Sequence, residues 1–488
     1  MREYGVPVSS FSISGAMVFD GSGRDGEMRD VHISRGRIVE TQNDPNAEII
    51  NGKGYALSPG FIDVHTHDDT AVLTQPQMPF KTLQGVTTVI VGNCGMSIAP
   101  RGAGLMGSLE LDSFSTYFDR LRDEPPAVNV AALVGHGSIR AKVMGTTTRR
   151  EASQDELLAM AKLVEDALHD GVMGISTGLA YEPGRYSPTN EIVQLTKLVA
   201  NANGIYATHM RNDGDELLAS VKESLHIGAE TGARIQISHL KVMGKRNHGS
   251  IGDAVQLIQE ARQQGIDVMA DQYPYTRGST ILDQLVSGGQ IIAINKNGLH
   301  HLESLLISSA PQHPEWEGMT LRDLAQQLSL GDRETVEYAL AECGRSLFVV
   351  IDSLNEDDVR KVMQEDFVMI GSDGVPAGSK PHPRLHHTFP RILAEYVRNL
   401  GLLSLPAAIH KMTGLSAQRF GLTNRGFIAD GYAADLVLFD PHTIQDTGTY
   451  IEPTTVPIGI KKVWVNGTLV ADDGQTTGNQ PGVPLIRQ

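Results

Sequence analysis

Two histidines one residue apart, His65 and His67, end the apolar segment 59–64 and are followed by two aspartates. In a strand, side chains at positions i and i+2 point to the same face, so both imidazoles can reach one ion. Neutral imidazole is the commonest metal ligand in proteins. A single His-x-His is a weak signal, because two unrelated surface or core histidines give the same pattern. The pair therefore predicts a metal site only if other ligand-type residues occupy equivalent positions further along the chain.

Four other residues with metal-binding side chains end predicted strands. Cys94 ends the strand predicted at 85–94, and later strands end at His209, His239 and Asp373. Taken singly, such a residue is commonly a packed thiol or a hydrogen-bonded histidine. Six of them at equivalent strand ends are harder to explain by packing, and the parallel strands of a barrel bring their carboxyl ends to one face. The pattern therefore predicts that the six side chains converge.

The elements that would position these residues alternate regularly between helix and strand. The clearest helix begins at Ser153, which forms a capping box with Glu156, and it ends at Gly171. We predict eight strands for the central sheet, at 59–67, 85–94, 172–177, 205–209, 233–239, 266–271, 346–352 and 367–373. Units of this kind in series most simply close into a (β/α)8 barrel, a TIM-like α/β fold. The alternation stops at about 280–345, which predicts an inserted subdomain over the barrel mouth, either a lid or a stabilising decoration.

Both ends of the chain have the pattern of short strands joined by tight turns. The segments 31–39 and 463–470 are predicted hairpins, the second with an Asn-Gly turn. Two strand-rich ends around a long middle indicate one small β-sandwich domain built from both termini. The predicted domains are the first part of this β-sandwich at 1–58, the metal-dependent barrel at 59–418 and the second part of the β-sandwich at 419–488.

Composition restricts the partners and the compartment. The 488-residue chain has a formal net charge of −16, which argues against nucleic acid or an anionic membrane surface as a partner. No apolar stretch approaches the ~20 residues needed to cross a bilayer, and the first residues lack the apolar core of a signal peptide, so we expect a cytoplasmic protein. The two cysteines, Cys94 and Cys343, fit a reducing compartment. Because the chain is acidic, an anionic substrate would need a local cluster of cationic residues. The oligomeric state stays open.

Short motifs surround the predicted ligands, among them Asn-Cys-Gly at 93–95 and Ser-His-Leu-Lys at 238–241. Further motifs lie at 59–69, 176–181, 207–211, 271–275, 371–374 and 381–384. Together they resemble the amidohydrolase superfamily, and within it the N-acyl-D-amino-acid deacylases, or D-aminoacylases. His-x-His with a terminal Asp marks only the superfamily, whereas the first two motifs narrow the likeness to this branch. It extends to 431–437 and so covers nearly the whole chain.

The resemblance implies a zinc enzyme, and a thiolate with two imidazoles and one open position suits zinc. Related two-metal amidohydrolases bridge their ions with a carboxylated lysine on the fourth strand. Here 172–178 contains no lysine, which favours a bridge by the thiolate of Cys94. The implied ligands are Cys94, His209 and His239 for one tightly bound zinc, and His65, His67 and Asp373 for a second, weak site.

By the same resemblance, the reaction is hydrolysis of the amide bond of an N-acyl-D-amino acid to a carboxylate and a free D-amino acid. A metal-activated water would attack, and Asp373 would act as general base and then as the acid that protonates the amine. The alternative for Asp373 is a pure metal ligand or a turn residue. The substrate is a small anion, and Arg384 and Lys241 are the cations that would bind its carboxylate; a solvated surface position is their alternative. Weaker candidates near the substrate are the tyrosines Tyr181, Tyr273 and Tyr275, for which core packing is the alternative.

Two departures from the pattern of the family leave details open. Arg277 stands where small residues are usual; it either selects an acidic D-side chain or is a surface charge. Arg384 is followed by Leu385, His386 and His387, where relatives have an aromatic or apolar residue and then Gly, so the shape of the anchoring loop stays open.

The alternative functions are a cyclic-amide hydrolase of the hydantoinase or dihydroorotase kind, a dipeptidase acting on D-residues, and a non-catalytic scaffold. The preferred side chain, the acyl group and the number of metals in use are not determined at this stage.

Overall fold

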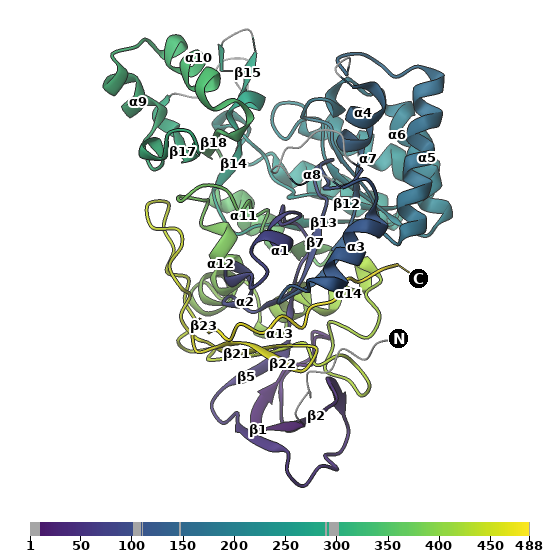
Figure 1. Ribbon diagram of the computed structural model, residues 1–488, viewed down its shortest axis with the longest axis vertical. Helices are drawn as coiled ribbons and strands as arrows, with labels where there is room; N and C mark the ends of the chain where they lie inside the picture. Colours follow the sequence, from purple (N-terminus) through teal and green to yellow (C-terminus); the bar gives the residue numbers. More distant parts are fainter. Residues whose placement is uncertain are drawn as a thin grey trace.

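The computed structural model describes residues 10–100, 109, 111–145, 148–287, 290–291 and 302–487. These residues form a mixed α/β fold with parallel strands at its centre, a β-sheet region at one end and a smaller lobe at the other (Figure 1). None of the described helices is long and apolar enough to cross a membrane.

The central strands form two parallel sheets that adjoin each other. Three strands run in the order β6 (Phe61–Asp63), β7 (Val86–Val91) and β8 (Asn129–Ala132). Six more run in the order β19 (Val368–Ile370), β13 (Val268–Gln272), β12 (Arg234–Ile237), β11 (Ile205–His209), β10 (Gly174–Gly178) and β9 (Val134–Gly135). Leu133 alone separates β8 from β9, and a parallel bridge joins Thr66, just past β6, to Gly374, just past β19. The sheets therefore meet at both of their outer edges.

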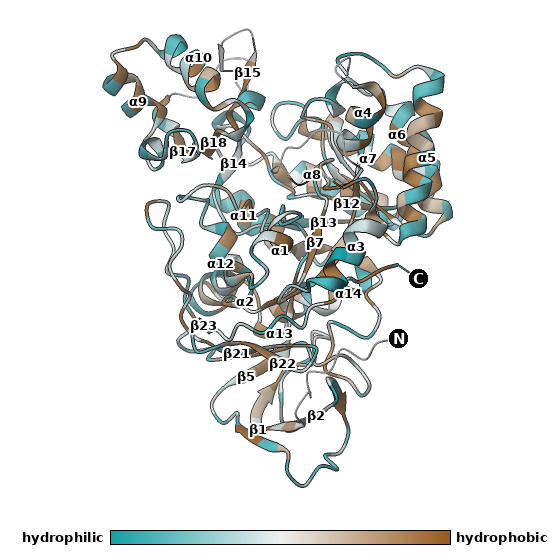
Figure 2. Cartoon of the chain, viewed as in Figure 1, coloured by the Kyte–Doolittle hydropathy of each residue, from teal (hydrophilic) through white to brown (hydrophobic). Residues whose placement is uncertain are grey.

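Helices cover these strands with their apolar faces turned inward (Figure 2). The predicted capping box at Ser153 and Glu156 is confirmed, and Gly171 ends this helix with a φ of 104°, which glycine adopts without strain. The buried stripe of that helix includes Leu157, Val164 and Leu168. Helices along this part of the chain are α3 (Phe114–Asp123), α4 (His136–Met144), α5 (Gln154–Asp170), α6 (Thr189–Asn201), α7 (Leu217–Thr231), α8 (Ile251–Gln263) and α11 (Glu356–Met363).

Shorter helices complete the layer around the strands. They are α1 (Ala71–Thr74), α2 (Pro79–Thr82), α12 (Arg384–Arg391), α13 (Leu405–Met412) and α14 (Gly414–Phe420), with a π-helix at Ile392–Asn399 after α12. The bonds of a π-helix run from residue i to i+5, and such turns are frequent beside functional sites. Here the π-helix continues the helix that begins at Arg384.

The two ends of the chain share one nine-stranded sheet. Both predicted hairpins are confirmed, because β2 pairs with β3 and β21 pairs with β22, each antiparallel. Phe11 from the first part stacks on Trp464 from the second, with ring centroids 5.4 Å apart. The strands are β1 (Phe11–Val18), β2 (Glu27–Ser34), β3 (Arg37–Val39), β4 (Glu48–Asn51), β5 (Ala56–Pro59), β20 (Leu436–Phe439), β21 (Ile460–Val465), β22 (Thr468–Asp472) and β23 (Gln475–Thr476).

The prediction that 346–352 belongs to the central parallel sheet is wrong. This segment forms β18 (Phe348–Asp352), which pairs antiparallel with β14 (Arg277–Ile281) and β17 (Leu305–Ser309). Its place in the parallel series is taken by β8 and β9, which we did not predict. The prediction failed because β18 packs in a separate apolar core. Its residues are therefore as apolar as those of a barrel strand, and the sequence pattern does not distinguish the two.

That second core includes Leu282, Trp316, Leu324 and Val349. Two helices belong to this lobe, α9 (Leu321–Leu328) and α10 (Asp332–Cys343), and it lies at the end of the molecule opposite β1 and β2 (Figure 1). The short strands β15 (Val286–Ser287) and β16 (Gln290–Ile291) pair near it. Residues 288–289 and 292–301 of the predicted insertion lie outside the described residues.

Candidate active site

Cys94 is the centre of the predicted ligand cluster. Its Sγ lies 3.3 Å from His65 Nε2, 3.6 Å from His209 Nδ1 and 3.6 Å from His239 Nε2. The thiol comes from the loop after β7, and each imidazole follows or ends a different parallel strand. The structure therefore brings these four predicted residues together at the carboxyl ends of the strands.

The other two predicted ligands extend the same cluster. Asp373 Oδ1 lies 3.2 Å from His67 Nε2 and 3.4 Å from His65 Nε2. One potential donor atom from each of His65, Cys94, His239 and Asp373 falls within 4.8 Å of the others. All six predicted ligands are buried, so their donor atoms are withdrawn from bulk water.

Three of the six residues adopt a left-handed backbone. The φ angles are 53° at Cys94, 37° at His239 and 50° at Asp373. Residues other than glycine, asparagine and aspartate seldom adopt this conformation, and it concentrates at functional sites where surrounding packing holds it. The strained turns immediately after β7, β12 and β19 therefore mark the same three loops that carry the candidate ligands.

The donor set fits zinc. A thiolate, several imidazoles and a carboxylate are the groups that zinc binds in proteins. Burial opposes ionisation of the thiol, but the charges of His65 and His239 hold the pKa of Cys94 well below its ordinary value. The anionic form of Cys94 is therefore favoured, and that form binds metal.

Asp271, near the end of β13, contacts two of the candidate metal-binding histidines and was not among the predicted site residues. Its Oδ1 lies 3.0 Å from His65 Nδ1 and accepts a hydrogen bond of 2.8 Å from the backbone N–H of His239. Its Oδ2 accepts a bond from Gln236 Nε2. Because Asp271 engages Nδ1 of His65, the Nε2 atom of that ring is turned to Cys94. The signal in the sequence was an acid at the end of the strand predicted at 266–271.

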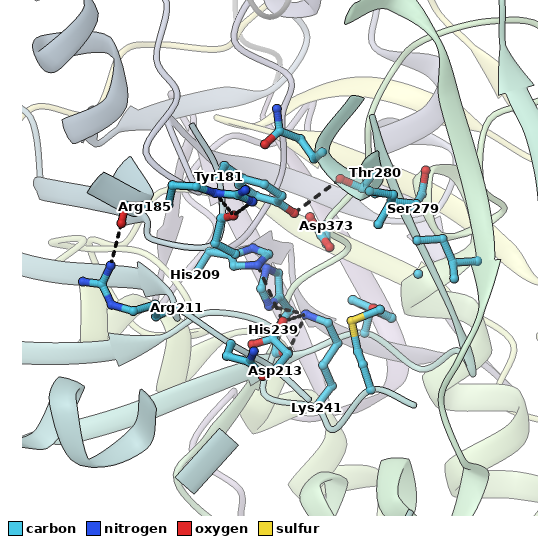
Figure 3. A pocket seen from close by; sticks show the side chains of 18 of the residues that line it. Tyr181, Arg185, His209, Arg211, Asp213, His239, Lys241, Ser279, Thr280 and Asp373 are labelled. Carbon is cyan, nitrogen blue, oxygen red and sulfur yellow. Dashed lines mark hydrogen bonds and ion pairs between the residues drawn. The ribbon is translucent and has the colours of Figure 1, made fainter. Parts of the chain in front are cut away.

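Asp213 is a second residue that the sequence reasoning missed. Its Oδ2 lies 2.8 Å from Lys241 Nζ and 3.6 Å from His209 Nε2, and Lys241 Nζ lies 2.7 Å from His239 Nδ1 (Figure 3). Burial disfavours the charged amine, but the carboxylate of Asp213 raises the pKa of Lys241. The available signal was an acid four residues after a strand-ending histidine.

A cavity of about 210 Å³ opens beside the cluster. Tyr181, Lys241, Tyr273, Asp373 and Arg384 are among its lining residues, as predicted for a substrate site. Arg384 Nη1 lies 2.9 Å from Asp373 Oδ2, and its guanidinium lies 4.6 Å from the ring centroid of Tyr273. The two predicted cations, Lys241 and Arg384, thus face one cavity in a chain of strongly negative net charge.

Two predicted substrate residues lie outside the lining of this cavity. The guanidinium of Arg277 lies 4.4 Å from the ring centroid of Tyr450 and 3.8 Å from a carboxylate oxygen of Asp352. Tyr275 packs against Arg391, whose guanidinium lies 4.9 Å from its ring centroid.

His386 and His387, which depart from the family pattern, also lie outside the lining of this cavity. His387 Nε2 lies 3.3 Å from Thr455 Oγ1 in the C-terminal part of the chain, and His386 packs against Phe80. Neither histidine lines the cavity.

The sequence profile of the amidohydrolase family matches residues 56–470. A D-aminoacylase from Alcaligenes xylosoxydans xylosoxydans is 39% identical over 491 residues, which cover 97% of each chain. The chain belongs to the amidohydrolase family, in its D-aminoacylase branch.

This membership confirms the resemblance inferred from the motifs. An N-acyl-D-aspartate deacylase of the same organism is also 39% identical, over 98% of this chain and 95% of its own. The solved structure of an N-acyl-D-glutamate deacylase from Bordetella bronchiseptica, complexed with zinc and a phosphonate inhibitor, has a TM-score of 0.89 and 35% identity. That match covers 98% of this chain and 99% of the other. The zinc in that solved structure agrees with the metal that the donor set of this chain suits.

Proposed function

We propose that this amidohydrolase cleaves the amide bond of N-acyl-D-amino acids with zinc as its cofactor, releasing a carboxylate and a free D-amino acid. The observation that carries the proposal is that a candidate metal site and a candidate carboxylate site lie at the same cavity. A buried thiol surrounded by imidazoles can hold a metal, and Arg384 and Lys241 beside it can bind a carboxylate. An N-acyl amino acid needs both, because its scissile amide and its carboxylate are attached to the same carbon.

The proposed architecture is one closed barrel. Eight strand positions result if β8 and β9 count as one strand, in the order β6, β7, β8–β9, β10, β11, β12, β13 and β19. The bridge from Thr66 to Gly374 and the bond from the Asp373 N–H to the His65 carbonyl support closure. We assign 59–418 to this (β/α)8 barrel, with the lobe around β18 as its inserted subdomain. The terminal segments 1–58 and 419–488 are assigned to the β-domain.

Zinc is assigned to the donors by their chemistry. Cys94, His209 and His239 hold the tightly bound ion, and His65, His67 and Asp373 provide a second, weaker site. When bound, zinc supplies a Lewis acid that lowers the pKa of water and polarises the amide carbonyl. Asp271 and Asp213 fix the orientation of the imidazoles, since a carboxylate at the second ring nitrogen sets which nitrogen faces the metal.

Asp373 is the proton-transfer group of this proposal. Its carboxylate lies at the cavity, between the histidine cluster and Arg384, and it takes a proton from water at Oδ1 or Oδ2. The same carboxyl then returns the proton to the departing amine nitrogen. An amide requires this step, because an unprotonated amine is a poor leaving group.

The substrate carboxylate binds to Arg384 and Lys241, with the hydroxyl groups of Tyr181 and Tyr273 as additional donors. The Oη of Tyr273 is buried and has no partner in the part of the chain that the structure describes, so it is available to a ligand. Tyr275 and Arg277 do not contact the substrate carboxylate in this proposal, because they pack against Arg391 and Tyr450, respectively.

The decisive experiment is a kinetic panel on the zinc-loaded protein. N-acetyl-D-amino acids with acidic, apolar and basic side chains are compared with their L-forms, with a hydantoin, with dihydroorotate and with dipeptides ending in a D-residue. We expect amine release from members of the D-acyl set. Turnover confined to the cyclic amides, or none at all with zinc bound, would overturn the proposal.

Asp373→Ala tests the proton-transfer step separately. The variant keeps the donors Cys94, His209 and His239, so we expect it to retain one zinc and to lose turnover. Near wild-type turnover would refute the role of Asp373.

A further inference from the structure

A second, larger cavity lies at the opposite ends of the parallel strands. Its volume is about 500 Å³, and it is lined by Met173 and Asn203, which lie just before β10 and β11, and by Arg234, the first residue of β12. The candidate metal ligands end or follow such strands. The second cavity is therefore separated from the active site by the length of the strands.

The charged residues that line this cavity are all cationic. Four arginines line it, Arg37, Arg234, Arg425 and Arg487, and no described lining residue is acidic. Arg425 forms an ion pair with Asp435, which lies outside the lining. The other three arginines make no ion pair with a carboxylate among the described residues, in a chain whose net charge is −16.

Two of these guanidiniums bind the carbonyls of adjacent residues. Arg234 Nη2 donates to the carbonyl of Asn203 at 3.0 Å, and Arg487 Nη1 donates to the carbonyl of the adjacent residue, Ala202, at 2.6 Å. Carbonyl oxygens accept hydrogen bonds but carry no net charge, so these bonds leave both guanidiniums cationic. Asp267, which lies outside the lining, interacts electrostatically with Arg234, and no described residue of the lining is acidic. Like charges repel each other, and an anion bound in the cavity would reduce that repulsion.

Arg234 also has an unused donor. Its Nε atom is buried and has no hydrogen-bond partner among the described residues. A buried donor left unpaired is unfavourable, so a ligand that accepts its hydrogen bond is favoured. Asp267, which directly precedes β13, forms its ion pair with Arg419 and acts on Arg234 only through its charge.

The C-terminal segment forms one wall of the cavity. The Leu485 N–H donates to the Val130 carbonyl of β8, and the Val130 N–H donates to the Val483 carbonyl, so the segment lies along the strand. This end of the chain lies beside α14 (Figure 1). Phe420, Leu422, Leu485 and Met173 add apolar surface to the wall. The cavity therefore combines cationic groups with a hydrophobic wall, in the size range of small-ligand sites.

We propose that this cavity is a binding site for a small organic anion, with an oxyanion head held by Arg37, Arg234 and Arg487 and an apolar body against Phe420 and Leu422. Guanidinium groups bind phosphate and carboxylate oxygens in paired hydrogen bonds, so both heads fit. A dianionic head neutralises more of the positive charge of these arginines than a monoanionic head does. The proposal does not depend on the proposed deacylase function.

The test is titration calorimetry on the full, zinc-loaded chain. The probes are phenyl phosphate, benzoate and benzyl alcohol, which share an aromatic body and carry two, one and no negative charges near pH 8. We expect phenyl phosphate to bind more tightly than benzoate, and benzyl alcohol not to bind measurably. If phenyl phosphate does not bind at millimolar concentration, the proposal is overturned.

Variants place the binding event in the cavity. Arg234→Gln should weaken phenyl phosphate binding about tenfold or more, because a charged hydrogen bond contributes about 1.5–3 kcal/mol. Arg37→Gln is the second variant, since this side chain is exposed and makes one hydrogen bond, to the Gly431 carbonyl, and it should weaken binding in the same direction. Arg333→Gln on α10 is the matched control, because its side chain is 60% exposed and lies in the other lobe. Unchanged affinity in both Arg234→Gln and Arg37→Gln would place the probe elsewhere and overturn the proposal.

Discussion

The guanidinium of Arg384 lies 2.9 Å from the carboxylate of Asp373, and the two side chains are 1% and 10% exposed. The proposed anchor of the substrate thus already neutralises the proposed proton-transfer group. Burial opposes the charged form of Asp373, but Arg384 and then His65 hold the pKa of this carboxyl well below its ordinary value. Binding and chemistry are therefore coupled through one ion pair.

This coupling makes Arg384→Gln a variant that should damage both KM and kcat. Removing one partner of a buried ion pair costs about 3–5 kcal/mol, so we expect kcat/KM to fall by roughly 10² or more. Arg384→Lys keeps the charge but not the paired geometry, and it should recover part of the loss. Steady-state kinetics on an N-acetyl-D-amino acid measures both, and a change confined to KM would argue against the coupling.

Asp271→Asn should weaken zinc binding without removing a ligand. Substitution of a carboxylate that orients a metal-binding histidine typically costs about 10–100-fold in metal affinity or activity, and Asp271 contacts both His65 and His239. Competition with a chromophoric chelator measures the zinc affinity. Asp267→Asn, which precedes the same strand at its other end, is the matched control. Equal zinc affinity of the two variants would show that Asp271 does not position the ligands.

Removal of zinc should abolish turnover, and zinc addition should restore it. Cys94→Ala should lose the tightly bound ion, because Cys94 lies within 3.6 Å of three imidazoles. Cys343→Ala removes the other thiol, which is buried in the lobe that carries α10, and it should keep zinc. Metal analysis of the two purified variants compares them directly. Equal zinc content in both would contradict the assigned site.

The buried cluster of His136, Arg140 and Glu191 predicts lower stability in acid. His136 Nε2 lies 2.8 Å from Glu191, and Arg140 lies 2.6 Å from the same carboxylate. Burial lowers the pKa of His136 although the bond to Glu191 opposes this. As the pH falls below the unfolded value of about 6.5, the unfolded chain takes up a proton that the folded His136 does not. The free energy of unfolding therefore falls with pH in this window.

Glu191 adds to the effect at lower pH. Burial raises its pKa, but the hydrogen bond from His136 and the charge of Arg140 lower it below the ordinary value. Its contribution is therefore present above about pH 4.5 and is lost as the pH falls through the folded pKa. Urea unfolding between pH 7 and pH 5 lies above the titration of Glu191, and comparison with a His136 variant isolates the contribution of His136 from that of other buried histidines. His136→Gln should reduce the slope by up to about 1.4 kcal/mol per pH unit, and an unchanged slope would contradict the burial effect.

The strands of the central sheet could be predicted from the sequence except at one position. Both β18 and the parallel strands are short, apolar and buried, so their patterns are alike. Conversely, β8 begins with the polar Asn129, whose side chain bonds to Thr87 and Asp435 inside the protein. Local hydropathy does not report which sheet a buried strand joins, because pairing depends on partners far along the chain.

The sequence by itself determined that His65, His67, Cys94, His209, His239 and Asp373 would converge, since parallel strands deliver their carboxyl ends to one face. Only the tertiary structure decided the pairing of Arg384 with Asp373 and the contacts of Asp213 and Asp271 with the imidazoles. It also placed Arg277 on Tyr450 rather than in the cavity. The position of a strand along the chain follows from local periodicity. The choice of ion-pair partner depends on which loops meet in space, and no spacing along the chain encodes that.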